Sequence, residues 1–235
     1  MLQSIVSVTT AFQKPKPMTD LVIFSDEREY IPNGDIQAYL KHCNLYAKEH
    51  QVFLVPHRLI IDNILYLCLF DPNGSIIGLQ GALHRNSKTQ TNLDLYSKLN
   101  ILQTRIGNIF LCVDTDIYYP ELLRYAKLKG ADLIISSQYI PKNELKPKLI
   151  TTGMWNAAQQ NEIYVVNCTN LYSAISAPIE ITSDKTGFLV QPNESGKISF
   201  KLNFSKLQDI AAKGMSAEKC NPNFCKKYAE LLGKS

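Results

Sequence analysis

Six cysteines are the residues of this 235-residue sequence best suited to nucleophilic or metal-binding chemistry. A thiolate can attack a carbonyl carbon or bind zinc, and its environment decides whether that thiolate forms. A thiol inside an apolar element usually behaves as a small buried hydrophobic group. We expect this behaviour from four cysteines that lie in apolar or helical segments: Cys43, Cys68, Cys112 and Cys168.

The other two cysteines, Cys220 and Cys225, flank a turn with the sequence Asn221-Pro222-Asn223-Phe224. A zinc site would need two more ligands nearby, and none of the four histidines is close in sequence. We therefore interpret both as unpaired thiols near a helix start. A local disulfide between them is the alternative that the spacing leaves open.

The common cofactor signatures are absent from the sequence. It contains no G-x-G-x-x-G, no Walker lysine motif and no H-E-x-x-H, so we expect no metal and no organic cofactor. The net charge of +4 comes from 25 basic and 21 acidic residues, and the lysines are dispersed. Such a mild, unpatterned charge argues against a nucleic-acid partner.

No feature of the sequence indicates a membrane segment or a leader. No apolar run approaches the roughly 20 residues that span a bilayer. Residues 1–12 lack the basic leading region of a signal peptide and have the pattern of a first strand. We expect no membrane partner and, by default, a cytoplasmic location.

Strand and helix patterns alternate over the first two thirds of the chain, which favours an α/β fold with mixed sheets. Apolar or alternating runs predict strands, and apolar residues at helical spacing predict helices. Without a repeat or a low-complexity linker, residues 1–235 form a single predicted domain. Strands are predicted at 5–8, 21–24, 51–56, 64–70, 75–79, 106–113, 131–136, 163–168 and 197–202, hairpin segments at 176–182 and 187–190, helices at 36–50, 120–129, 154–161, 205–213 and 225–232, and a polar loop or lid with a short helix at 86–100.

Five sequence blocks follow one another in a distinctive order. They are residues 20–24, 67–77, 105–111, the Tyr119-Pro120-Glu121-Leu122 corner with 129–134, and Trp155 with 157–166. The last two are the most specific, since they match a Phe-Pro-Glu…Gly-Ala-Asp unit and a tryptophan–helix–strand unit. In this order the blocks resemble the carbon–nitrogen hydrolase (nitrilase) superfamily over nearly the whole chain.

The resemblance implies a four-layer αββα sandwich of two mixed β-sheets flanked by helices. It also implies a homodimer, because subunits of this family commonly pair sandwich to sandwich. The family reaction is hydrolysis or condensation at a nonpeptide C–N bond, so the implied ligand is a small amide or nitrile. In that reaction a cysteine thiolate attacks carbon, a glutamate is the base, and a lysine stabilises the developing charge, without metal or cofactor.

Two of the three family positions carry other residues here. Asp26 stands at the glutamate position, with Glu27 one residue later, and an aspartate side chain is one methylene shorter. Counting from Gly74 of the hairpin, the lysine position falls near Ala82. Lys88 is the lysine that follows it in this segment, several residues late in polar sequence. Misplacement of an ångström or more is costly for catalysis.

The nucleophile position has two alternative registers. The family cysteine stands six residues before the proline of the corner, and counting back from Pro120 gives Asp114. Cys112 lies two residues earlier, inside an apolar strand. If residues 114–118 contain a two-residue insertion, Cys112 remains the nucleophile, and Cys112-Val113-Asp114 then copies the family's Cys-x-Asp order. The sequence leaves both registers open.

These departures lead to competing functional hypotheses. The first is a family member that lost catalysis and acts as a partner subunit or small-molecule binder. The alternative is an active amidase or nitrilase-type enzyme that uses Cys112, Glu27 and Lys88. A third is an acid-based hydrolase in which Asp114 and Asp116 cluster with Asp26 or Glu27, although all these acids could instead be solvated loop residues.

Overall fold

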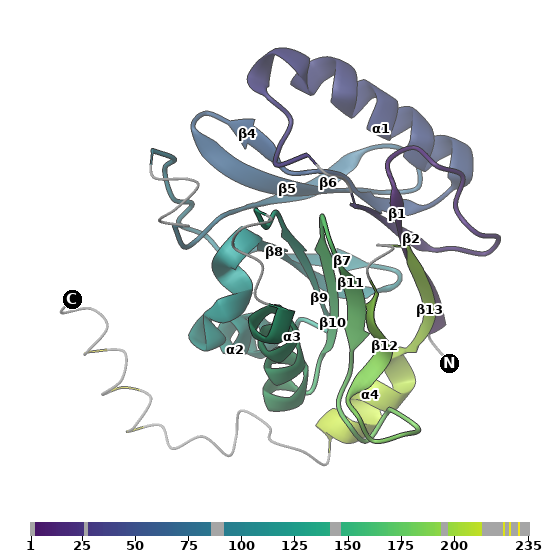
Figure 1. Cartoon of the computed structure of the whole chain (residues 1–235), viewed down its shortest axis with the longest axis vertical. Coiled ribbons are helices and arrows are strands. Elements are labelled where there is room, and N and C mark those ends of the chain that lie inside the picture. The colour runs from purple at the N-terminus through teal and green to yellow at the C-terminus, as the bar shows by residue number, and fades with distance from the viewer. Residues whose placement is uncertain are drawn as a thin grey trace.

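Two β-sheets lie face to face with helices on their outer faces (Figure 1). The computed structural model describes residues 3–25, 28–85, 92–141, 147–193 and 197–212, together with Asn223, Lys226 and Glu230. The expected αββα sandwich is confirmed. No helix in this part of the chain is long and apolar enough to cross a membrane.

The first sheet has the strand order β13-β1-β2-β3-β5-β4, and β6 pairs with β5. Its three neighbours β1, β2 and β3 run parallel, whereas the remaining pairs are antiparallel. The strands are β1 (Gln3–Thr10), β2 (Leu21–Ser25), β3 (Phe53–Val55), β4 (Leu59–Ile61), β5 (Ile64–Phe70), β6 (Ile76–Gly81) and β13 (Ile198–Asn203).

The second sheet has the order β12-β11-β10-β9-β8-β7. Its central strands β8, β9 and β10 are parallel, and antiparallel strands form its edges. The strands are β7 (Ile101–Thr104), β8 (Gly107–Val113), β9 (Leu133–Gln138), β10 (Tyr164–Thr169), β11 (Ser173–Ser176) and β12 (Phe188–Asn193).

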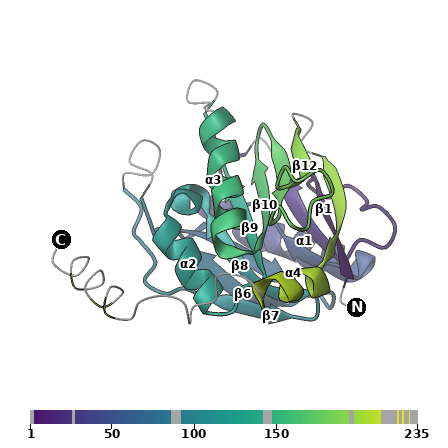
Figure 2. The same cartoon turned by 90° about the horizontal axis from the view of Figure 1, so that it is seen from below.

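Helices cover the outer face of each sheet (Figures 1 and 2). The helix α1 (Ile36–His50) packs Tyr39, Cys43 and Ala47 on the first sheet, because residues three and four apart share one helix face. The second sheet is covered by α2 (Pro120–Leu128) and α3 (Pro147–Asn161). The short 3-10 helices are η1 (Asn33–Asp35) and η2 (Asp114–Tyr118), and α4 (Phe204–Ala211) follows β13.

The main core lies between the two sheets. Side chains alternate between the two faces of a strand, so Leu111 and Val113 of β8 enter this core while Phe110 and Cys112 face α2 and α3. A strand buried on both faces must be apolar throughout, which explains the continuous apolar run in the sequence.

The predicted elements agree closely with the structure where the pattern is long. The helix 36–50 and the strand 64–70 have the predicted ends. The structure adds β7 and β4, which were not predicted. The β4–β5 turn consists of Asp62 and Asn63, both with positive φ (48° and 62°), a two-residue turn that matches the twist of a hairpin.

Three other predictions need correction or lie outside the described residues. The helix predicted at 154–161 begins at Pro147 instead, because its first turns carry few apolar residues. Residues 92–100 form no helix, only a bridge between Asp94 and Ile64. Residues 86–91, the helix predicted at 225–232 as a whole, and both Cys220 and Cys225 lie outside the described residues.

Candidate functional site

The carboxyl ends of parallel strands from both sheets meet at one place, and polar residues follow each of these ends. In an α/β sheet this edge is where ligands usually bind. The cavity there is lined by Phe24 and Ser25 of β2, Arg28, His57 and Arg58 after β3, Ser137 and Gln138 of β9, Cys168 and Thr169 of β10, and Asn170.

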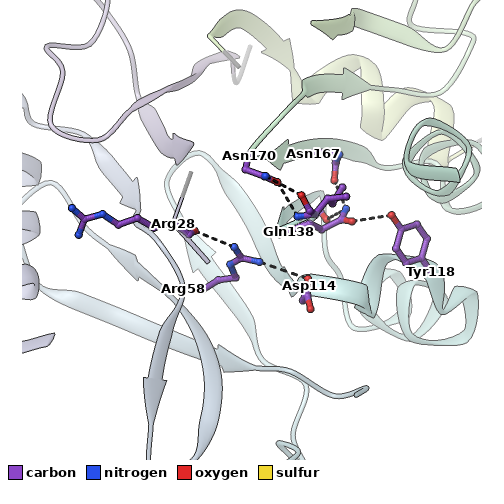
Figure 3. A network of polar contacts seen from close by, with 9 residues as sticks. Arg28, Arg58, Asp114, Tyr118, Gln138, Asn167 and Asn170 are labelled. Carbon is purple, nitrogen blue, oxygen red and sulfur yellow. Dashed lines mark hydrogen bonds and ion pairs between the residues drawn. The ribbon is translucent and has the colours of Figure 1, made fainter. Parts of the chain in front are cut away.

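An ion pair joins the two sheets beside this cavity. Arg58, which follows β3 of the first sheet, reaches Asp114 at the end of β8 in the second sheet (Figure 3). Nη1 of Arg58 lies 3.6 Å from Oδ1 of Asp114, and each side chain is only 4% exposed. Nη2 of Arg58 also donates to the carbonyl oxygen of Arg28 at 3.4 Å. The pair is therefore shielded from solvent.

Burial and neighbouring charges have opposite effects on the pKa of the Arg58 guanidinium. Burial lowers the pKa of the guanidinium, and the neighbouring Asp114 carboxylate raises it. The pKa of Glu29 is raised by burial, lowered by Arg58 and raised by Asp114. Because arginine titrates far above neutral pH, a buried charge of this kind is stable only beside an acid. Asp114 supplies that acid.

Asp114 occupies a sharp turn at the tip of β8. Its φ is +50°, and it is the first residue of η2. Positive φ is uncommon outside glycine, but aspartate and asparagine tolerate it better than most residues. This backbone directs the Asp114 side chain away from the strand's own alternation and toward Arg58.

Cys112 lies in a different environment, although it is only two residues away. It is fully buried within β8 on the face that packs against α2 and α3, in contact with the cluster of Ile117, Leu122 and Met154. Burial, and then Asp116 and Asp114, raise the pKa of this thiol well above its ordinary value. The thiol is therefore protonated at neutral pH.

Ala82 follows β6 at the position where the family resemblance places the lysine, so this position carries no charge. Ala82 is 3% exposed and packs in the core between the sheets. The next residues are held by Asp116, which accepts hydrogen bonds from the backbone nitrogens of Leu83 (3.1 Å) and His84 (2.9 Å). His84 Nδ1 lies 2.9 Å from the same carboxylate, and its ring stacks on Tyr119. Asp116 therefore ties the end of the first sheet to η2.

The two acids of η2 thus have separate partners. Asp114 and Asp116 are 3% and 0% exposed, so the interpretation of both as solvated loop residues is wrong. Arg58 pairs with Asp114, whereas the backbone nitrogens of Leu83 and His84 donate to Asp116. Within the described ranges, no group of three histidine, cysteine or acidic residues is arranged to hold a metal ion.

A network of amides stands on the other side of the cavity. Tyr118 donates its hydroxyl proton to Gln138 Oε1 at 2.8 Å, and Gln138 Nε2 donates to Asn167 Oδ1 at 2.7 Å (Figure 3). Asn170 exchanges two hydrogen bonds with the backbone of Ile140. These contacts fix the ends of β9 and β10 relative to each other.

The cavity enclosed by the described residues is small. Its volume is about 10 Å³, which is roughly one water molecule's worth of space.

Several of the residues singled out from the sequence cannot be placed. Asp26, Glu27 and Lys88 lie outside the described residues. The sequence analysis did not single out Arg58. The position immediately after a buried parallel strand was the available signal, since such positions line the carboxyl edge of the sheet.

The buried thiols give a pH prediction. Burial raises the pKa of Cys43 and Cys168 to about 12 from an ordinary 9.0. A raised folded-state pKa contributes stability that is present below pH 9 and is lost as the pH rises toward 12. Between pH 8 and pH 10 each thiol should lower the free energy of unfolding by about 1.4 kcal/mol.

Urea unfolding at pH 8 and at pH 10 measures this change in the free energy of unfolding. The Cys43→Ala/Cys168→Ala variant should lose about 2.7 kcal/mol less over that interval than the natural sequence. An equal loss in both proteins would contradict it.

Comparisons with known proteins agree with this architecture. A family model described as carbon–nitrogen hydrolase matches residues 24–200. No curated protein gives a significant match. A carbon–nitrogen hydrolase from Helicobacter pylori G27 is similar in structure, with a TM-score of 0.77 and 15% identity over 98% of each chain.

Two further solved structures have the same fold. Nit3 of Saccharomyces cerevisiae, a member of branch 10 of the nitrilase superfamily, has a TM-score of 0.71 and 14% identity over 93% of this chain and 97% of its own. A cysteine-to-serine mutant of an amidase from Nesterenkonia AN1 has a TM-score of 0.66 and 14% identity over 89% and 95%.

Proposed function

We propose, since the chain belongs to the carbon–nitrogen hydrolase family, that it is a non-catalytic member of that family and acts as a partner subunit. The observation that carries this proposal is the buried ion pair between Arg58 and Asp114. Asp114 stands six residues before Pro120, where the family resemblance places the nucleophilic cysteine.

The environments of the two candidate nucleophiles, Cys112 and Asp114, also support a non-catalytic function. In a glutamate-to-leucine mutant of the Nesterenkonia amidase, the acetamide moiety of fluoroacetamide is added covalently to the active-site cysteine. A thiol attacks in this way as a thiolate. Cys112 is buried, its pKa is raised, and it faces the helices instead of the cavity. The Asp114 carboxylate is engaged by a guanidinium, which weakens it as a nucleophile or base.

The size of the cavity favours a subunit over a small-molecule binder. A space of about 10 Å³ does not hold an amide or a nitrile. Moving Arg58 would break its buried ion pair with Asp114, which is costly. Binding energy for a small ligand would first have to offset that loss.

Thiol alkylation tests the proposal. The folded protein is treated with iodoacetamide near neutral pH, and labelled positions are read by mass spectrometry. We expect Cys112 to react no faster than the buried Cys43 and Cys68, because all three are protonated and inaccessible. The Ser97→Cys variant, at an exposed loop position, is the positive control and should be labelled rapidly.

The active alternative makes the opposite prediction. Selective labelling of Cys112, or hydrolysis of small amides or nitriles that Cys112→Ala removes, would overturn the non-catalytic assignment. In that case Glu27 and Lys88 would be the residues to substitute next.

We also propose that a second copy of the chain packs against the outer face of α2 and α3, as the family's sandwich-to-sandwich pairing implies. A groove of about 230 Å³ runs between these helices, and Pro120, Leu123 and Leu149 are among its lining residues. Leu149 is 51% exposed, so an apolar side chain faces solvent in the single chain. Burying such surface is the usual source of dimer stability.

A matched pair of variants tests this interface. Leu149→Glu should convert a dimer to a monomer in analytical ultracentrifugation, because a carboxylate cannot be buried unpaired. Leu45→Glu, at a 53% exposed position of α1 in the opposite layer, should leave the dimer unchanged. If both variants remain dimers, the interface lies elsewhere on the chain.

The cytoplasmic location stays a prediction from the sequence.

A further inference from the structure

The sequence contains two asparagine–glycine pairs, Asn33-Gly34 and Asn73-Gly74, and neither belongs to the site described above. An asparagine side chain is most reactive in this setting, because glycine has no Cβ to hinder attack by its own backbone nitrogen. The structure places the two pairs in different surroundings. We propose that Asn33 is a site of spontaneous deamidation in the folded protein, and that Asn73 is protected although the same residue follows it.

The reaction needs only the chain and water. The backbone nitrogen of the glycine loses its proton and attacks Cγ of the asparagine, so that a C–N bond forms and the side-chain nitrogen takes up a proton and leaves as ammonia. Water then opens the cyclic imide at one of its two carbonyl carbons, which gives aspartate or isoaspartate. Both products carry a carboxylate in place of a neutral amide. The glycine nitrogen must be able to approach Cγ, so the backbone between the two residues must be free to rotate.

The pair Asn33-Gly34 meets this requirement. Both residues are exposed and belong to η1, a 3-10 turn of three residues in which none is buried. A Cβ built on Gly34 would have nothing within 4 Å. The first nitrogens of a helix have no intrahelical acceptor, and here Asp35 donates the first such bond, to the carbonyl oxygen of Pro32 at 3.0 Å. A short exposed turn of this kind opens at little cost.

The pair Asn73-Gly74 does not meet it. The nitrogen that would attack is already engaged, since Gly74 donates to the carbonyl oxygen of Asp71 at 2.9 Å. Gly74 is buried with a φ of +83°, and a Cβ there would lie 2.7 Å from the carbonyl oxygen of Asn44. The side-chain nitrogen of Asn44 also donates to the carbonyl oxygen of Gly74, at 2.6 Å. Gly74 is therefore held at both its nitrogen and its oxygen.

The side chain of Asp71 closes the same turn a second time. Its Oδ1 accepts from the backbone nitrogens of Asn73 at 3.0 Å and of Ser75 at 2.8 Å. Rotation of the backbone between Asn73 and Gly74 would break these bonds together with the bond that Gly74 donates. Opening this turn therefore costs more than opening η1, because several hydrogen bonds are lost at once. The turn around Asp71, and not the residue type, protects Asn73.

The fold can keep the product at position 33. Asn33 stands directly before α1, and negative charge is stabilised at the N-terminus of a helix, where Asp35 already lies. Ile31 and Ile36 are buried on either side, so the change is confined to the exposed residues 32–35. The modified protein should therefore accumulate in the folded state with a net charge that is lower by one. The site is separate from the ion pair that closes the cavity and does not depend on the loss of catalysis.

Incubation of the folded protein at mildly alkaline pH tests the proposal. The conversion of each asparagine amide to an acid is followed by mass spectrometry of peptides. We expect Asn33 to convert at least about tenfold faster than Asn73, which corresponds to a difference of about 1.4 kcal/mol in the cost of opening. In the urea-unfolded protein the two asparagines should convert at similar rates, because glycine follows both of them.

Two variants act on one pair each. Gly34→Ala should slow the conversion of Asn33 by about tenfold or more, because the added Cβ hinders the attack while it meets no other atom of the fold. Asp71→Ala removes the acceptor of Asn73 and Ser75 and should speed the conversion of Asn73 without changing that of Asn33. Equal rates at the two asparagines of the folded protein, faster conversion of Asn73, or an Asn73 rate that Asp71→Ala leaves unchanged would each overturn the proposal.

Discussion

Arg58→Met should lower the free energy of unfolding by about 3–5 kcal/mol, because it removes the guanidinium that pairs with the buried carboxylate of Asp114. The guanidinium lies 3.6 Å from that carboxylate, and both side chains are 4% exposed. Urea denaturation of the folded protein measures the effect, read from the transition midpoint.

Two further variants separate the ion pair from general surface effects. Arg105→Met removes an exposed partner of Asp20, at 60% and 25% exposure, and should cost at most about 1 kcal/mol. Arg58→Met/Asp114→Leu removes both buried charges and should recover most of the lost stability. If Arg58→Met cost no more than Arg105→Met, the ion pair would not be the contact that closes the site.

Asp116→Ala should be the second most damaging change, at about 3 kcal/mol or more. The carboxylate is fully buried and accepts from the backbone nitrogens of both Leu83 and His84. Its removal takes the acceptor away from two partly buried backbone donors, and hydrogen bonds to a charged group are worth about 1.5–3 kcal/mol each. The same urea experiment measures the loss.

Hydrogen exchange adds a local readout for Asp116. In Asp116→Ala, the amides of Leu83 and His84 should exchange faster than in the natural sequence, because their acceptor is gone. Asp94→Ala is the matched control, since Asp94 is exposed and accepts a side-chain hydrogen bond from Asn63. It should cost less than about 1 kcal/mol. Unchanged protection at Leu83 and His84 would contradict the role assigned to Asp116.

The non-catalytic function that we propose requires the fold to be kept without the catalytic residues of the family. The ends of β3 and β8 still have to meet, whether or not chemistry takes place between them. In this chain the contact is an arginine–aspartate pair, and Asp116 fastens the end of β6 to the same turn. These contacts hold the two sheets in register around a nearly filled cavity.

The sequence by itself determined the elements with strong local patterns. The helix 36–50 and the strand 64–70 follow directly from apolar spacing, because burying one helix face or both strand faces constrains each residue locally. The order of the blocks was enough to predict the sandwich. The strands β4 and β7 were not predicted, because they are short and are stabilised mainly by their neighbours in the sheet.

Only the tertiary structure decided which groups face the cavity. The sequence left Cys112 and Asp114 as alternative occupants of the strand end, since both lie within two residues of it. The side chain of Cys112 follows the strand's alternation toward the helices, whereas the positive φ of Asp114 turns its carboxylate toward Arg58. That partner stands 56 positions away in the other sheet, and no local pattern encodes a contact over such a distance.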